Sequence, residues 1–509
     1  MRSSEPTHSW WAATSGPREY PRLRGFQEAD VCVVGAGLAG LTTAYLLARE
    51  GRGVIVLDDN AIGGGETGQT TAHLASANDD YFHVLERIHG PEAARLVYRS
   101  HQEAIEEIGR IVSREAIDCE YERVNGYWWL AEETAPDFLR TEFDAARRAG
   151  AEVELLDHVP GLPCERRPAL RFGRQGQFHP LRYLQGLAAC IERDGGAIHT
   201  GNHVTEIESA DGARAAGDAF EVRAGAIVVC TNTPIVDRFA VHTKQAPYRT
   251  FVIAARVPRG TFPHLLLWDT LDPYHYVRLA RIDADPASEL LVAGGEDHKT
   301  GHFDDGVRRF AALERWARAR FPMMGAVEHR WSGQVMEPVD HLAFIGRDPG
   351  GREDVYVVTG DSGQGMTHGT IAGMVIRDQV LGRTNPWEHL YAPTRRSLDA
   401  ASVKEWITEN LDVGKQYLDL VPGVHITAED PSDIMPGSGA ILQRGTMKVA
   451  AFRTDDGELI ERSAYCPHLG CVVRWNSLEH SWDCPCHGSR FAPDGEVLNG
   501  PAAGPLAKV

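Results

Sequence analysis

The sequence has no run of about 18 apolar residues among its 509, so we expect no membrane-spanning helix. Its first 30 residues lack the apolar core of a signal peptide and a twin-arginine pair, so we expect a cytoplasmic protein. Basic side chains are in deficit, because 52 Lys and Arg stand against 71 Asp and Glu, a net charge of −19. Such a field repels phosphate backbones, so we expect no nucleic-acid partner.

What is present is typical of a globular protein, since 43% of the residues are hydrophobic and 24% are charged. The length predicts about three domains. Of the nine cysteines, five are scattered and four gather near the C-terminus, at Cys466, Cys471, Cys484 and Cys486. In a cytoplasmic protein, clustered cysteines indicate metal or redox chemistry more often than a disulfide scaffold.

A dinucleotide-binding pattern occupies residues 31–58. A valine-rich run, a glycine turn, an alanine- and leucine-rich stretch and a second apolar run follow one another there. Gly35 permits the tight turn, Gly37 lets the backbone approach a pyrophosphate, and Gly40 lets the helix pack on the strand. Asp58, about 20 residues past the glycines, would accept hydrogen bonds from a ribose hydroxyl. We therefore predict a strand–helix–strand unit that binds a dinucleotide.

Two further glycine-rich segments follow predicted strands. Residues 63–72 read GGGETGQTTA, and residues 355–365 read VYVVTGDSGQG and lead into a helix. Both suit other parts of the same cofactor site, with Asp361 accepting a hydrogen bond from a ribityl hydroxyl. A flexible loop and an ordinary strand–helix turn are the alternatives for the two segments.

The composition along the chain predicts an α/β protein in which a Rossmann-like cofactor-binding domain is interleaved with an α+β substrate domain, followed by a small all-β domain. The predicted limits are 1–25 for an N-terminal extension, 26–80, 181–235 and 336–385 for the cofactor-binding domain, 81–180 and 236–335 for the substrate domain, 386–420 for a helical linker and 421–509 for the β domain. In the linker, apolar side chains from Val403 to Leu411 share one face. We expect this face to dock the β domain.

Together the three glycine-rich segments resemble the D-amino-acid oxidase-like family of FAD-dependent oxidoreductases, over about residues 20–385. The resemblance implies FAD and oxidation of a C–N bond in an amine or amino acid. It implies cofactor contacts at Gly35, Gly37, Gly40 and Asp58 for the ADP half, Val204 for the adenine, Thr70, Thr71 and Ala72 for the isoalloxazine, and Gly360, Asp361 and Gly363 for the ribityl chain. In relatives whose flavin is covalently linked to a histidine, that histidine occupies the position of Gln69 in this chain.

The C-terminal cysteines and histidines form C-x-H, 15 intervening residues and C-x-x-H. Two thiolates and two imidazoles at this spacing resemble a Rieske protein, in which the cysteines bind one iron and the histidines the other. The implied [2Fe-2S] ligands are Cys466, His468, Cys484 and His487. A Cys2His2 zinc site and a purely structural cysteine cluster are the alternatives. Zinc does not explain Cys471 and Cys486, which stand where some Rieske proteins carry a disulfide.

Catalytic candidates come from weaker patterns. Tyr274, Tyr276 and Arg278 alternate, so one strand face presents all three. Arg278 could clamp a substrate carboxylate, and an inter-domain salt bridge is the alternative. His73 lies close in sequence to the segment from Thr70 to Ala72 that is expected to contact the flavin. Its role could be acid–base catalysis, and a structural hydrogen bond is the alternative.

These patterns predict a dehydrogenase of a small amine or amino acid that passes electrons from FAD to the Rieske cluster and on to a one-electron acceptor protein. A fused cluster is useful where the acceptor takes single electrons, and fusion keeps it concentrated near the flavin. We expect His468 and His487 to lie nearest the surface as the exit point. The alternatives are a peroxide-producing oxidase with an accessory cluster, a nicotinamide-fed reductase and a non-catalytic redox sensor or electron carrier.

Overall fold

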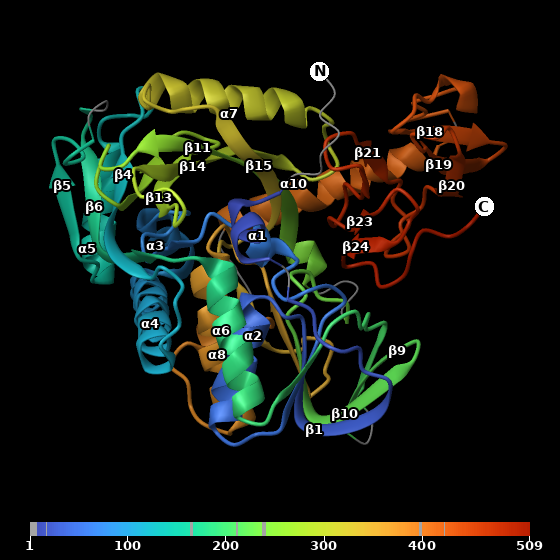
Figure 1. Ribbon diagram of the computed structural model, residues 1–509, viewed down its shortest axis with the longest axis horizontal. Coiled ribbons are helices and arrows are strands. Elements are labelled where there is room, and N and C mark those ends of the chain that lie inside the picture. Colours follow the sequence, from blue (N-terminus) through green and yellow to red (C-terminus); the bar gives the residue numbers. More distant parts are fainter. Residues whose placement is uncertain are drawn as a thin grey trace.

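The protein, seen here as a computed structural model, consists of two large sheets with their helices and a small β part that carries the C-terminus (Figure 1). The structure describes residues 8–16, 18–162, 166–209, 212–236, 241–395, 400–421 and 423–509. Residues 1–7 and 17 of the predicted N-terminal extension lie outside these ranges.

The first sheet is mostly parallel. Its order is β16 (Phe344–Arg347), β17 (Val355–Thr359), β10 (Phe220–Val229), β1 (Gly25–Val34), β2 (Val54–Leu57) and β7 (Ala197–His199), and the antiparallel strands β8 (Glu206–Ser209) and β9 (Ala213–Gly217) extend it beside β10. The C-terminal halves of β1 and β10 and all of β2 and β17 are buried, because parallel strands are covered on both faces. This sheet confirms the predicted Rossmann-like α/β fold.

Helices α2 (Leu38–Arg49), α6 (Pro180–Arg193) and α8 (Gly365–Val380) lie close together beside this sheet (Figure 1). Helix α2 packs between the other two, so it is buried almost all round. That burial explains why its sequence is apolar on every face and not amphipathic. Within the described residues, no helix combines the length and apolar character needed to cross a membrane.

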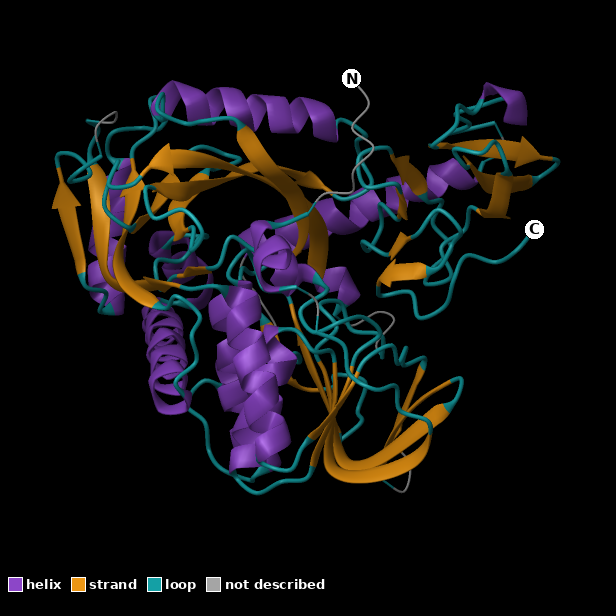
Figure 2. Ribbon diagram, in the orientation of Figure 1, coloured by secondary structure: helices purple, strands orange, loops and turns teal. Residues whose placement is uncertain are grey.

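The second sheet is larger and mixed, and it curves over the first part of the molecule (Figure 2). Its order is β15 (Val327–Pro338), β11 (Gln245–Pro258), β14 (Ser288–Lys299), β13 (Tyr276–Arg281), β12 (Leu265–Asp269), β4 (Glu122–Trp129), β6 (Ala169–Gln177) and β3 (His73–Leu74), with β5 (Val153–Leu156) paired to β6. Helix α7 (Gly306–Arg320) covers its outer face, and a separate hydrophobic core fills the space between them.

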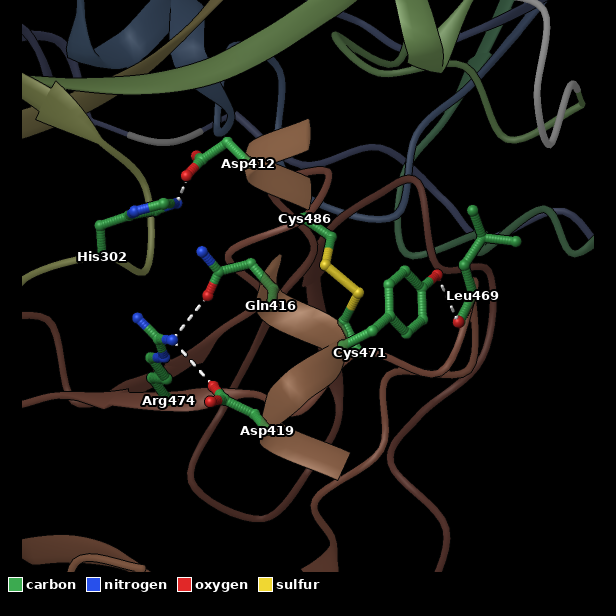
Figure 3. Close-up of a disulfide and its surroundings, with 9 residues drawn as sticks. His302, Asp412, Gln416, Asp419, Leu469, Cys471, Arg474 and Cys486 are labelled. Atoms are coloured by element: carbon green, nitrogen blue, oxygen red, sulfur yellow. Dashed lines mark hydrogen bonds and ion pairs between the residues drawn. A yellow bond between two sulfur atoms is a disulfide. The ribbon is translucent and has the colours of Figure 1, made fainter. Parts of the chain in front are cut away.

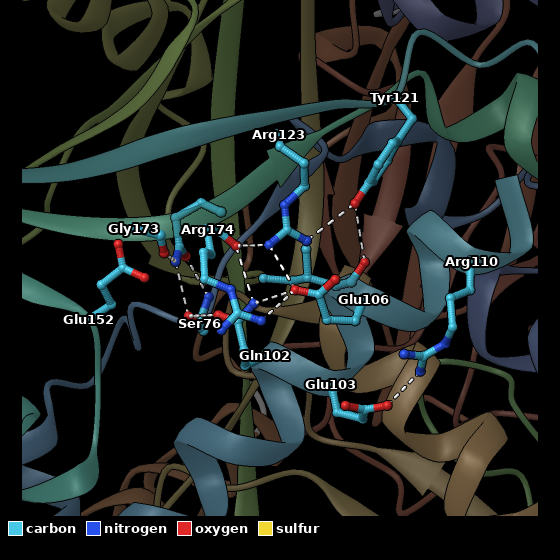
Figure 4. Close-up of polar contacts among 12 residues, drawn as sticks. Ser76, Gln102, Glu103, Glu106, Arg110, Tyr121, Arg123, Glu152, Gly173 and Arg174 are labelled. Carbon is cyan, nitrogen blue, oxygen red and sulfur yellow. Dashed lines mark hydrogen bonds and ion pairs between the residues drawn. The ribbon is translucent and has the colours of Figure 1, made fainter. Parts of the chain in front are cut away.

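Besides α7, three helices belong to the part of the molecule built around the second sheet, namely α3 (Phe82–His89), α4 (Pro91–Glu115) and α5 (Phe138–Ala149). Polar side chains tie α4 to strands β4 and β6 (Figure 4). The Glu106 carboxylate accepts from Arg123 at 3.0 Å and from Arg174 at 2.8 Å, and Gln102 donates to the Arg174 carbonyl at 3.3 Å. These pairs are partly exposed, so they orient α4 while contributing at most about 1 kcal/mol each.

The N-terminal helix α1 (Trp10–Ser15) belongs to the core. Trp11 is fully buried, and its indole N–H donates to the Thr70 carbonyl at 2.6 Å. The described part of the predicted N-terminal extension therefore supports the glycine-rich loop.

The chain leaves the two large sheets through α9 (Glu388–Tyr391) and α10 (Ala400–Gln416), and η3 (Tyr417–Leu420) follows. The prediction that the apolar face of this segment docks the β domain is wrong. Val403, Trp406, Ile407 and Leu411 are between 42% and 62% exposed. The opposite face makes the contacts instead, because Lys299 pairs with Glu409 at 2.9 Å and with Asp412 at 3.1 Å.

The C-terminal part contains two small antiparallel sheets, as predicted for an all-β domain. One holds β18 (Ser438–Arg444), β19 (Met447–Arg453) and β20 (Leu459–Ser463), and the other holds β21 (Arg474–Asn476), β22 (Ser481–Asp483), β23 (Arg490–Phe491) and β24 (Val497–Asn499). The strand positions in all three parts agree with an interleaved arrangement, and the exact domain limits stay a prediction.

Candidate functional site

A cavity of about 800 Å³ lies where the two large sheets and the C-terminal β part meet. Its wall includes most of the predicted cofactor residues, namely Gly35, Gly37, Asp58, Thr70, Thr71, Val204, Gly360, Asp361 and Gly363, together with His73 and Tyr276. Gly40 and Ala72 are not among the described residues that line it. This volume is in the range of small-molecule and cofactor sites.

The glycine turn after β1 has no room for side chains. A Cβ on Gly35, whose φ is +109°, would lie 2.4 Å from the Cys230 carbonyl oxygen. A Cβ on Gly40 would lie 1.8 Å from the Gly35 carbonyl oxygen. Helix α2 therefore begins pressed against β1 with its N-terminus at the cavity, which is the arrangement that binds a pyrophosphate.

Asp58 lies directly after β2, and its carboxylate faces the same turn. It accepts hydrogen bonds from the backbone N–H of Ala36 at 2.5 Å and of Asn60 at 2.8 Å. Burial raises the pKa of the Asp58 carboxyl. These bonds fix the carboxylate at the end of the strand, where it could accept from a ribose hydroxyl as predicted.

Two tryptophans that the sequence patterns missed hold the loop from Gln69 to Ala72. The Trp11 indole donates to the Thr70 carbonyl, and the Trp331 indole donates to the Gln69 carbonyl at 2.8 Å. Their contribution depends on tertiary contacts across 59 and 262 residues, so no local motif could have revealed it.

The second glycine segment forms the opposite wall. Gly360 and Gly363 both have φ near +72°, a conformation that favours glycine. Asp361 between them accepts a long hydrogen bond from the Met336 N–H at 3.4 Å, and burial raises its pKa to about 6. Its carboxylate therefore has acceptor capacity to spare for a cofactor hydroxyl.

His73 and Tyr276 line the cavity at the end formed by the second sheet. The Tyr276 hydroxyl is 2.6 Å from the Thr250 hydroxyl, and His73 Nδ1 is 3.0 Å from that of Thr71. Burial, helped by the positive charge of Arg278, lowers the pKa of His73 to about 3. His73 is thus a neutral imidazole, suited to hydrogen bonding and not to holding a proton.

Arg278 does not reach the cavity wall, so neither the carboxylate clamp nor the inter-domain salt bridge describes it. Its Nη1 donates to the carbonyls of Ala72, Thr71 and Phe178 at 2.8, 3.2 and 3.2 Å. The residue is 2% exposed, and its guanidinium lies over the Trp11 ring. Arg278 therefore positions the flavin loop from behind.

The four predicted cluster ligands converge in the C-terminal part. Cys466 and Cys484 are each 2% exposed, and a hydrogen bond from the Cys484 thiol lowers the pKa of Cys466. The rings of His468 and His487 lie 5.0 Å apart between centroids. Burial lowers the pKa of His487 to about 3, which keeps the imidazole in the neutral form that binds metals. Two adjacent thiols and two adjacent imidazoles fit a [2Fe-2S] cluster with mixed ligands.

Cys471 and Cys486 form a disulfide that joins the two ligand loops (Figure 3). Because their sulfurs are bonded to each other, they are not available as ligands. The end of α10 and η3 brace the same loops. Arg474 donates to Gln416 at 2.6 Å and to Asp419 at 2.8 Å, and Tyr417 donates to the Leu469 carbonyl at 3.0 Å.

The loop that contains Ala502 is bound to the segment that follows the predicted ligand His487. The Ser489 hydroxyl accepts from the N–H of Ala502 at 3.1 Å. Phe491 is fully buried in the hydrophobic cluster that also contains Cys466 and Cys484. The resemblance to Rieske proteins implies a tyrosine at the position of Phe491, whose hydroxyl would donate to a ligand thiolate, and Phe491 has no such hydroxyl.

We expect Phe491→Tyr to raise the reduction potential of the cluster by roughly 60 mV, a tenfold change in a one-electron equilibrium constant. A hydrogen bond to a ligand sulfur stabilises the added electron. Redox titration followed by electron paramagnetic resonance measures the shift. Phe26→Tyr, on a ring that is 54% exposed in β1, is the matched control. An unchanged potential in Phe491→Tyr would contradict this explanation.

The two histidines predicted as cluster ligands lie against the flavoprotein part. The His242 ring lies 5.0 Å from that of His468 and 6.1 Å from that of His487. His487 is 5% exposed. The prediction of a surface exit point at both histidines is therefore wrong for His487, because a segment remote in sequence covers it.

Comparison with known families matches residues 30–379 to the model described as FAD dependent oxidoreductase. The chain belongs to this family. Residues 426–509 match the Rieske [2Fe-2S] domain, so the cofactors are FAD and a Rieske cluster, and the protein is an oxidoreductase. The described glycine cradle fits FAD, and the donor set fits the cluster.

A full-length relative is the putative Rieske 2Fe-2S iron-sulfur protein YhfW of Bacillus subtilis (strain 168), 31% identical over all of this chain and 98% of the relative. Gamma-glutamylputrescine oxidoreductase of Escherichia coli (strain K12) is 27% identical over 74% of this chain and 90% of that protein. Among solved structures, glycine oxidase from Geobacillus kaustophilus has a TM-score of 0.60 at 18% identity, covering 72% of this chain and 99% of that one. That structure shows the shared fold of the flavoprotein part.

Proposed function

We propose that the protein is a dehydrogenase that oxidises a C–N bond of a small amine or amino acid and passes the electrons from FAD through the Rieske cluster to a one-electron acceptor. The observation that carries the proposal is the shared wall between the two centres. Val497, Leu498, Asn499, Gly500 and Ala502, from β24 and the loop after it, line the cavity, and the same loop is bound to Ser489, two residues after His487.

Specific hydrogen bonds tie this wall together. Gln334, which lines the cavity, donates to the carbonyl of Gly488, the residue next to His487, at 3.1 Å. Glu66, at the start of the flavin loop, accepts from the Gln334 N–H at 2.6 Å and from Asn499 at 2.7 Å. The cluster loops are thus held directly against the cavity, as short-range electron transfer requires.

When bound, FAD accepts a hydride from the carbon next to nitrogen, and the cluster takes one electron at a time. The chain's own residues position the substrate and exclude water. Tyr276 and Trp268 form part of the buried wall at the second sheet, and His73 can exchange hydrogen bonds there without carrying charge. Such positioning is the main contribution that the protein makes to hydride transfer.

The proposal is tested by supplying amines and amino acids anaerobically and following the flavin absorbance. We expect bleaching by a substrate, followed by reduction of a one-electron dye or protein much faster than peroxide formation in air. Faster peroxide formation would favour an oxidase, and no bleaching by any amine or amino acid would favour an electron carrier.

We expect Gln334→Leu to slow cluster reduction by reduced flavin several-fold, roughly 3- to 10-fold, because the link to the cluster loop is lost and a buried acceptor is left unpaired. Stopped-flow absorbance separates this step from flavin bleaching, which should be unchanged. Gln443→Leu, a strand substitution whose glutamine forms hydrogen bonds with Gly445 and Gly423 among the described residues, is the control. Equal slowing in the control would contradict the role of Gln334.

A further inference from the structure

The end of the cavity formed by the second sheet carries acidic side chains. Asp79 and Asp297 both line it. No arginine or lysine is found in the cavity wall anywhere in the described ranges of the chain. Arg278, the basic residue that sequence placed here, donates to backbone carbonyls behind the flavin loop.

Among the described residues, the side-chain hydrogen-bond donors of the two carboxylates are neutral, Tyr274 and Gln364 for Asp79 and Thr250 for Asp297. Asp79 accepts from the Tyr274 hydroxyl at 2.8 Å. The Oδ1 atom of Asp297 is buried and accepts no hydrogen bond from any described residue. Burial raises the pKa of Asp79 to about 7 and that of Asp297 to about 6, and each carboxylate is near other acids. A buried carboxylate with spare lone pairs calls for a charged donor.

Aromatic rings surround the same space. The cavity wall includes Trp268, Tyr274, Tyr276 and Tyr81. The Tyr274 and Tyr276 rings are 5.6 Å apart, and the His73 ring is 5.5 Å from that of Trp268. Aromatic faces attract organic cations, most strongly where water is excluded.

We propose that this end of the cavity binds a protonated aliphatic amine that carries no carboxylate, in preference to an α-amino acid; the inference rests on the proposed oxidation of an amine or amino acid. An ammonium group supplies charged donors to Asp79 and to the unpaired Oδ1 atom of Asp297, and it lies against the aromatic faces. The carboxylate of an α-amino acid would instead enter a site with two acids and with neither arginine nor lysine in its described wall, where like charges repel.

The first test measures binding without turnover. tert-Butylammonium has no hydrogen on the carbon next to nitrogen, so it cannot be oxidised, and pivalate has the same shape with a negative charge. Calorimetry and flavin difference spectra of the holoenzyme should show that the ammonium binds at least about tenfold more tightly than pivalate. Equal binding, or tighter binding of pivalate, would overturn the proposal.

Variants then assign the binding to the two acids. Asp79→Asn and Asp297→Asn should each weaken tert-butylammonium binding about tenfold or more, because a charge-assisted hydrogen bond is lost. Asp157→Asn, at an exposed carboxylate outside the cavity wall, should leave it unchanged. FAD content and thermal unfolding show whether each variant folds, and the probe comparison in the unmodified protein does not depend on them. Unchanged binding in two folded variants would overturn the assignment.

A second experiment separates this inference from the proposed function. Cadaverine and lysine differ by one carboxylate, and so do putrescine and ornithine. We expect the amine of each pair to bleach the flavin anaerobically at least about tenfold faster than its amino acid. Faster bleaching by the amino acids would overturn the inference and leave the proposed function standing. If no amine or amino acid bleaches the flavin, the proposed function itself fails, whatever the binding results show.

Discussion

Replacing His487 by alanine should abolish reduction of a one-electron acceptor, with a loss of more than about 100-fold, while substrate still bleaches the flavin under anaerobic conditions. Removing a residue that only hydrogen-bonds a metal ligand typically lowers metal affinity or activity 10- to 100-fold, and removing a ligand lowers it further. His487 lies in the C-terminal part, whereas the glycines predicted to bind FAD lie in the turn between β1 and α2 and in the first turn of α2, so the flavin half-reaction should be spared.

The measurement pairs steady-state acceptor reduction with single-turnover flavin bleaching and electron paramagnetic resonance of the cluster. His389→Ala, at an exposed histidine of α9, is the control and should keep both activities. Cys466→Ser is a second ligand variant that should reproduce the result. Wild-type acceptor turnover in either ligand variant would show that the cluster is dispensable, and the oxidase alternative would then be preferred.

The parts of the site that sequence predicted well depend on local spacing. Gly35, Gly37 and Asp58 lie within one strand–helix–strand unit, so their relative positions follow from 3.6- and 2-residue periods alone. The same is true of the two cysteine–histidine pairs, because a ligand and its neighbour two or three residues away share one tight loop. Such patterns carry their geometry within a few residues.

Arg278 shows where that reasoning stops. The alternation along β13 placed its side chain on the face of Tyr276, but two residues further along a strand amount to about 6.6 Å, which is enough to pass beyond the cavity. Its partners, the carbonyls of Thr71, Ala72 and Phe178, come from segments at least 100 residues away. A two-residue period predicts on which face of the sheet a side chain lies. It does not predict whether the side chain lies beside the cavity or beyond its edge.

The prediction for helix α10 was wrong for a related reason. An apolar stripe from Val403 to Leu411 predicts a packed face, yet the ion pairs from Lys299 to Glu409 and Asp412 turn the other face inward. Likewise the contact of His242 with both ligand histidines joins segments more than 220 residues apart. These features arise from how the C-terminal β part seats on the flavoprotein part, which no local pattern encodes.

The largest effect on the flavin side should come from Gly40→Ala. The new Cβ would lie 1.8 Å from the Gly35 carbonyl oxygen and 3.2 Å from the Val33 side chain, so α2 must move away from β1. Moving its N-terminus displaces the amides that would face the pyrophosphate, and overpacking of this kind costs roughly 1–3 kcal/mol of stability.

We therefore expect purified Gly40→Ala protein to have lost nearly all its FAD, with affinity lowered at least about 100-fold, while the cluster stays loaded because its ligands lie in a separate core. The ratio of flavin to iron absorbance and the thermal unfolding temperature check both expectations. Gly53→Ala is the matched control within the same unit, because its Cβ would meet its nearest neighbour, Asp30, at 3.5 Å, an ordinary contact. Full FAD occupancy in Gly40→Ala would mean that α2 can shift without disturbing the cofactor, and that the tight helix–strand contact serves stability alone.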